Sequence, residues 1–152
     1  MTLHLASSAF RSGDKIPQRF TCEGANVSPP LSWSGAPEAA RSFALVCSDP
    51  DAPGGTFYHW AVFDIPRGIT ELAEHHRPAA ALPHEAVNDF GKKGYGGPCP
   101  PHGHGDHHYH FRIFALDTES LRAGPRASCR DIERASKEHA VAEAELVGTF
   151  AR

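Results

Sequence analysis

Five histidines lie close together in the segment GPCPPHGHGDHHYHFRIFALD, which spans residues 97–117: His102, His104, His107, His108 and His110. Imidazole side chains bind metals, donate hydrogen bonds to anions when protonated, or remain as solvated polar groups. Three interpretations therefore compete for this segment: a metal site, a pocket for an anionic ligand, or a polar loop without chemistry.

A metal site is disfavoured by the spacing of these histidines. Zinc sites use three or four ligands that come from spaced, rigid elements. Neighbouring residues of a strand point to opposite faces, so at most His108 with His110, or His107 alone, can join one centre. We therefore expect no native metal and no cofactor, and we keep a histidine-cluster metal-binding protein as an alternative function.

A second group with chemical potential is DPDAPGG, residues 49–55, which places Asp49 and Asp51 among prolines that restrict the backbone. The simplest interpretation is a turn, because Asp and Pro are favourable turn residues. His59 lies in an apolar stretch and needs a polar partner, for which Asp49 is the candidate. Such a carboxylate would raise the pKa of His59. The pair could also act as acid and base on a phosphate ester, so a hydrolase is a second alternative.

Other catalytic signatures are weak. The sequence contains no GxSxG elbow, no Walker loop and no GxGxxG motif before a helix. Cys99 would be a reactive nucleophile only if a nearby cation lowered the pKa of its thiol. We therefore predict no catalytic residue, and a protein that binds rather than an enzyme.

The composition predicts one soluble domain over residues 1–152. The formal net charge of −3 gives no basic surface for nucleic acid. No apolar run approaches the ~20 residues of a membrane span, and the start MTLHLASSAFRSGDK lacks the pattern of a signal peptide. We expect a cytoplasmic protein whose four cysteines are mostly thiols.

The elements that must position these residues are mainly strands. The 14 glycines and 13 prolines divide the chain into short segments, as in β-rich domains. Strands are predicted over residues 42–48, 56–65 and 107–116, and a last strand over the tail AEAELVGTFAR. One helix is predicted over residues 129–140, with Ser128 as its cap and Asp131 completing a capping box. A β-sandwich with a minor helical component follows.

Strand periodicity assigns the candidate residues to faces. In the strand 107–116, His107 and Tyr109 share a face. In the strand 56–65, His59 is expected to share a face with Phe57, Ala61, Phe63 and Ile65, opposite to Tyr58, Trp60, Val62 and Asp64.

Several motifs together resemble the phosphatidylethanolamine-binding protein (PEBP) family, in its bacterial and archaeal Raf-kinase-inhibitor-like branch. The motifs occur in the family's order from about residue 20 to 150: SPPLSWSGAP, DPDAP, HWAVFDIP, NDFGKKGYGGPCPP, HHYHFRIFALD and AEAELVGTF. The combination of DPDAP, GxCPP and HxY is specific.

The resemblance implies a mainly antiparallel fold of two packed β-sheets with a few short helices. It also implies a small cavity that binds phosphate, acetate or a phosphoethanolamine head group. Matched motif by motif, the ligand-binding residues are Asp49, Pro53, Phe57, His59, Gly97, Pro100, Pro101, His107 and Tyr109. On this interpretation the prolines stiffen one lip of the pocket, and His102, His104, His108 and His110 are surface residues.

The sequence departs from eukaryotic members by Cys99 before the proline pair and by HGHGD before His107. Both features are typical of the prokaryotic branch, and they put eukaryotic lipid specificity and kinase targets in doubt. Cys22 and Cys99 fall on loops near the pocket mouth, which leaves a disulfide between them open. The resemblance also favours a homodimer. The function predicted is capture of a small anion, with regulation of a kinase or another partner through the pocket rim.

Overall fold

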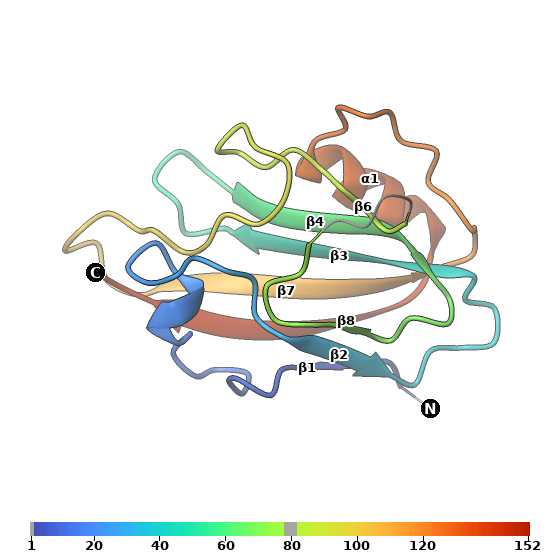
Figure 1. Ribbon diagram of the computed structural model, residues 1–152, viewed down its shortest axis with the longest axis horizontal. Coiled ribbons are helices and arrows are strands. Elements are labelled where there is room, and N and C mark those ends of the chain that lie inside the picture. Colours follow the sequence, from blue (N-terminus) through green and yellow to red (C-terminus); the bar gives the residue numbers. More distant parts are fainter. Residues whose placement is uncertain (1, 78–81) are drawn as a thin grey trace.

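The computed structural model describes residues 2–77 and 82–152, and its centre is a five-stranded antiparallel sheet (Figure 1). The strands run in the order β6-β4-β3-β7-β8. Their bounds are β3 Ser42–Asp49, β4 Phe57–Pro66, β6 His84–Glu85, β7 His107–Leu116 and β8 Ala140–Phe150. The strands predicted at 42–48, 56–65 and 107–116 are thereby confirmed, and the predicted tail strand begins two residues earlier than expected.

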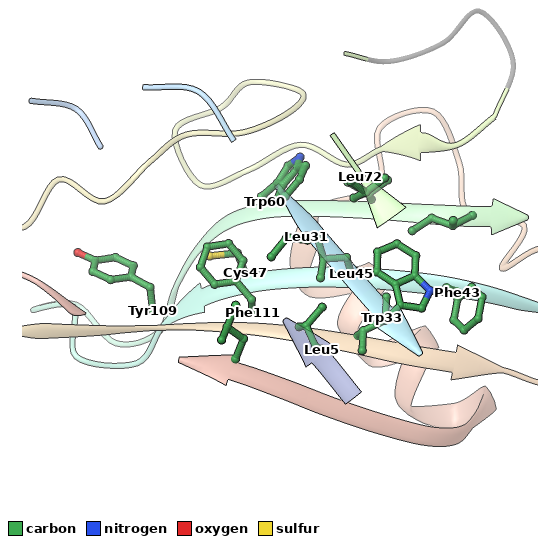
Figure 2. Packing of buried hydrophobic residues seen from close by; sticks show 14 of the residues in the cluster. Leu5, Leu31, Trp33, Phe43, Leu45, Cys47, Trp60, Leu72, Tyr109 and Phe111 are labelled. Atoms are coloured by element: carbon green, nitrogen blue, oxygen red, sulfur yellow. The ribbon is translucent and has the colours of Figure 1, made fainter. Parts of the chain in front are cut away.

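A smaller sheet packs on one face of the large one. Its order is β1-β2-β5, with bounds His4–Ala6, Leu31–Ser34 and Glu71–Leu72, and a short 3-10 helix, η1, spans Gln18–Phe20. Side chains from both sheets form the main hydrophobic core, which includes Leu5, Trp33, Phe43, Trp60 and Phe111 (Figure 2). The predicted two-sheet β-sandwich is confirmed.

The opposite face of the large sheet is covered by the single α-helix of the described residues, α1, Cys129–His139 (Figure 1). Its start follows from the sequence, because Ser128 accepts a hydrogen bond from the Asp131 amide while the Asp131 side chain accepts one from the Ser128 amide. Ile132 of this helix is fully buried in a second apolar cluster against the sheet. Among the described residues, no helix combines the length and the apolar character that a membrane span requires.

In β4 the predicted pairs Trp60 with Val62 and Ala61 with Phe63 share faces, but the predicted alternation is wrong after His59 and again at Ile65. Trp60, Val62 and Ile65 lie in the main core, whereas Ala61 and Phe63 face the helix side. The cause is irregular pairing with β3, whose register shifts between Cys47 and Ser48 and again between Phe43 and Leu45. Each extra residue in one strand reverses the alternation that follows it, which a strict period of two does not anticipate.

Candidate functional site

A cavity of about 220 Å³ lies where three neighbouring strands of the large sheet meet at one end. Strand β3 is antiparallel to both β4 and β7, so the end of β3 lies beside the first residues of its two neighbours. Asp49 therefore comes from the end of β3, Phe57 and His59 from the start of β4, and His107 and Tyr109 from the start of β7. Loop residues complete the lining: Ala52, Pro53, Phe90, Cys99, Pro100 and Pro101.

Eight of the nine residues predicted for the pocket line this cavity, and Gly97 does not. Gly97 lines a neighbouring cavity of about 360 Å³, which shares Phe90 and Cys99 with the first. It is packed closely against backbone, because a Cβ at this position would overlap the Phe20 carbonyl oxygen and lie 2.5 Å from Asn26 Oδ1. The Gly97 amide donates to the same Asn26 oxygen at 2.8 Å. This hydrogen bond holds the segment that precedes the proline lip against Asn26.

Three lining residues were missed by the sequence analysis: Ala52, Phe90 and Cys99. Phe90 is 46% exposed and its ring centre lies 4.8 Å from that of Phe57, so it forms an apolar edge of the cavity mouth. The available signal was an isolated phenylalanine in the otherwise polar segment NDFGKKG. Ala52 lies within the DPDAP motif and could have been carried over with it.

Asp49 pairs with His107 and not with His59. His107 Nδ1 donates to Asp49 Oδ2 at 2.6 Å, and both side chains are buried. The other oxygen, Asp49 Oδ1, accepts the Asp51 amide at 2.8 Å. The expected Asp49–His59 pair, on which the hydrolase alternative depends, is therefore not formed.

The second ring nitrogen of His107 is also occupied. His104 Nδ1 lies 2.6 Å from His107 Nε2, so the two rings share a hydrogen bond while His107 Nδ1 is bonded to Asp49. His104 is a surface residue as expected, but its contact with the buried ring of His107 was not predicted. His108 and His110 do face outward, where they bond Asp51 and Glu145.

His59 uses one ring nitrogen to fix its orientation. Its Nδ1 donates to the Gly96 carbonyl oxygen at 2.7 Å, and the residue is 4% exposed. Burial lowers the pKa of His59, although the Gly96 carbonyl and the Asp49 charge act in the opposite direction. Asp49 acts to raise this pKa, as expected, but the net shift is downward because desolvation of the imidazolium is the larger effect.

The hydroxyl of Tyr109 has no hydrogen-bond partner among the described residues, although it is fully buried. In Figure 2 this hydroxyl points away from Cys47 and Phe111, beyond the end of the core cluster. Burial, followed by the negative charge of Asp49, raises the pKa of Tyr109, so the hydroxyl keeps its proton and remains a donor.

The lip that carries Pro100 and Pro101 is anchored at both ends. Cys99 forms a disulfide with Cys22, which lies 77 residues earlier in the chain. Arg152 Nε donates to the Pro100 carbonyl oxygen at 2.7 Å, and the Gly103 amide donates to the Arg152 carbonyl oxygen at 2.9 Å. The expectation that the cysteines are mostly thiols thus holds only for Cys47 and Cys129, and the disulfide that the resemblance left open, Cys22–Cys99, is present.

Metal-ligand geometry is absent from the part of the chain that the structure describes. No group of three or more His, Cys, Asp or Glu side chains there is arranged to hold a metal ion. Because successive side chains of a strand point to opposite faces, His107 lines the cavity while His108 points to solvent. Each of these rings bonds a different carboxylate, which keeps them apart.

Comparison with known proteins gives matches over almost the whole chain. The chain is 44% identical over 152 residues to a UPF0098 protein of Aquifex aeolicus, covering 99% of this chain and 89% of that protein. It is 46% identical to a UPF0098 protein of Methanothermobacter thermautotrophicus, covering 99% of each. The crystal structure of Escherichia coli YbcL, described as a new member of the mammalian PEBP family, superposes with a TM-score of 0.93 at 33% identity and covers 100% of this chain and 99% of that one.

The family model described as phosphatidylethanolamine-binding protein matches residues 6–151. With that match, the two-sheet fold and these bacterial and archaeal relatives, the chain belongs to the phosphatidylethanolamine-binding protein family.

Proposed function

We propose that this protein binds a small phosphate- or carboxylate-bearing anion in the cavity beside Tyr109. The observation that carries the proposal is the fully buried Tyr109 hydroxyl, which lacks a partner among the described residues. A buried donor without an acceptor costs about 1–3 kcal/mol, so such a group calls for an explanation. An anionic oxygen in the cavity supplies the missing acceptor.

The size and rigidity of the cavity favour a ligand of few atoms. Its volume of about 220 Å³ lies below the range of roughly 300–1,000 Å³ common for drug-sized ligands. The proline lip and the Cys22–Cys99 disulfide hold the wall in place, which reduces the entropy lost when a ligand binds. Hydrogen bonds to a charged group contribute roughly 1.5–3 kcal/mol each in such an environment.

Isothermal titration calorimetry with inorganic phosphate, phosphoethanolamine and acetate between pH 5 and 7 tests the proposal. We expect saturable binding of at least one of these anions, and a loss of about tenfold or more in affinity for Tyr109→Phe. Tyr58→Phe is the matched control, because Tyr58 is a buried tyrosine on the helix side of the sheet whose hydroxyl bonds Glu133.

Tyr58→Phe is expected to leave the affinity unchanged. Equal losses in the two variants would indicate a general effect of removing a hydroxyl and would contradict the proposal. An absence of heat with all three anions would also contradict it.

The wider role included in this proposal is regulation of a kinase or another protein through the pocket rim. Phe90 supports this part, because it is one of the large apolar side chains that are exposed and it stands at the cavity mouth. A partner that covers Phe90 would also control access to the cavity. The cytoplasmic location and the homodimer stay predictions.

A further inference from the structure

The cavity contains one hydrogen-bond acceptor that its own residues leave unused. His59 Nδ1 is committed to the Gly96 carbonyl oxygen, so neutral His59 carries its proton on that nitrogen. Its Nε2 then presents a lone pair, and none of the hydrogen bonds among the described residues involves this atom. The buried environment that lowers the pKa of His59 favours this neutral form.

The cavity also contains one unused donor, the Tyr109 hydroxyl, and the two groups are close. The ring centres of His59 and Tyr109 lie 5.3 Å apart, with an interplanar angle of 79°. His107 adds no free group, because both of its ring nitrogens are already bonded. A small occupant between these rings therefore meets a donor on one side and an acceptor on the other.

The charges around His59 disfavour a dianion. Two carboxylates act electrostatically on His59, Asp49 at the end of β3 and Asp89 in the loop before the proline lip, and the ring of Tyr109 on β7 packs against it. The adjacent rings of Phe57 and Phe90 carry no charge. The negative charges of the two carboxylates therefore repel a dianion in the cavity more strongly than a monoanion.

We propose that the cavity selects a protonated oxyanion, such as dihydrogen phosphate or the monoanion of a phosphate monoester, whose P–OH donates to His59 Nε2 while an unprotonated oxygen accepts from Tyr109. This inference rests on the anion binding proposed above and specifies its ligand class. An oxyanion without a proton would place its lone pairs against that of Nε2 and leave the ring nitrogen unsatisfied. Sulfate esters and phosphate diesters belong to the rejected class because they carry no such proton.

Methyl phosphate and methyl sulfate form a matched pair for the test. The two ions have the same shape, and below the second phosphate pKa of about 6 they also have the same charge, so they differ there by one proton. Calorimetric titration of the wild-type protein from pH 5 to 8 measures both affinities. At pH 6 we expect methyl phosphate to bind about tenfold or more tightly than methyl sulfate.

The pH dependence separates this proposal from simple attraction to an imidazolium. The affinity for methyl phosphate should fall as the pH rises above about 6, because the dianion has lost its P–OH. Methyl sulfate should gain affinity only at the acidic end, where His59 becomes protonated and Nε2 turns into a donor. Equal affinities for the two esters across the range would overturn the inference while leaving anion binding in place.

Binding of neither ester would also overturn this inference, and the proposed function would fail with it only if phosphate, phosphoethanolamine and acetate gave no heat either. His59→Gln provides a second readout, because the glutamine amide offers both a donor and an acceptor. The ratio of the two affinities is expected to fall to less than about threefold in this variant. A ratio unchanged from the wild type would contradict the role assigned to His59 Nε2.

Discussion

The carboxylate of Asp49 accepts two hydrogen bonds, one from His107 Nδ1 at 2.6 Å and one from the Asp51 amide at 2.8 Å. This buried aspartate therefore joins the DPDAP turn to the first residue of β7. Its role is to fix the wall of the cavity and the tautomer of His107, since both of its oxygens are already in use.

Asp49→Asn is expected to destabilise the protein by about 1–3 kcal/mol, because asparagine offers one oxygen to two N–H donors and leaves one of them unsatisfied. Urea unfolding monitored by tryptophan fluorescence measures the change. Asp51→Asn is the control: its side chain is 41% exposed and pairs with the exposed His108, so a loss below about 1 kcal/mol is expected. A loss for Asp49→Asn no larger than that of the control would contradict this assignment.

Tyr109→Phe should raise the ligand-free stability by about 1 kcal/mol, because it removes a buried hydroxyl that lacks a partner. The same substitution at Tyr58 removes a hydrogen bond of 2.7 Å to Glu133, so it should lower the stability by about 1 kcal/mol. Unfolding curves in a buffer free of phosphate and acetate give both values. If Tyr109→Phe lowered the stability as much as Tyr58→Phe does, the Tyr109 hydroxyl of the wild-type protein would have a hydrogen-bond partner in the absence of ligand.

The stability should fall as the pH is lowered from about 7.5 to 5. Burial lowers the pKa of His59 below the value of about 6.5 expected in the unfolded chain, so the unfolded state binds more protons in this range. His76 acts in the same direction, because burial also lowers its pKa. His59→Asn keeps a donor for the Gly96 carbonyl but does not titrate, so its stability should change less with pH than that of the wild type.

Urea unfolding at three pH values across this range, with His76→Asn as the parallel variant, measures the two contributions. A pH slope for His59→Asn as steep as that of the wild type would show that His59 titrates alike in the folded and unfolded chains.

Gly97→Ala is expected to destabilise the lip, because the added Cβ would overlap the Phe20 carbonyl oxygen and crowd Asn26 Oδ1. We expect a loss of about 1–3 kcal/mol, in the range of overpacking substitutions, and weaker anion binding. Gly68→Ala is the control, since nothing lies within 4 Å of a Cβ at that position. Thermal unfolding and a phosphate titration of both variants provide the comparison. Equal stabilities and equal phosphate affinities would show that the lip accommodates the added Cβ without loss of stability or binding.

The fold and most of the cavity lining could be predicted because they depend on local patterns. Alternation placed His107 and Tyr109 on one face, and the capping box at Ser128 marked the start of the helix. The polar contacts could not be predicted, because they depend on register. The irregular pairing beside His59 redirects the side chains that follow it, and Asp49 meets His107 only through the alignment of β3 with β7.

Long-range loop contacts were equally inaccessible to pattern analysis. Phe90 reaches the cavity from a loop whose path is set by the Asn88 side chain, which accepts the amides of Phe90 and Lys92. His104 reaches His107 from the HGHGD segment, where glycines with positive φ at 103 and 105 set the backbone direction. Neither contact has a periodic signature in the sequence.

The most direct measurement is a crystal structure of the protein grown in phosphate near pH 6. We predict a phosphate between His59 and Tyr109, with one oxygen about 2.5–3.0 Å from the Tyr109 hydroxyl oxygen. Phosphate bound only elsewhere, or the space between these two rings filled by a protein side chain, would contradict the assignment of this cavity as an anion-binding site.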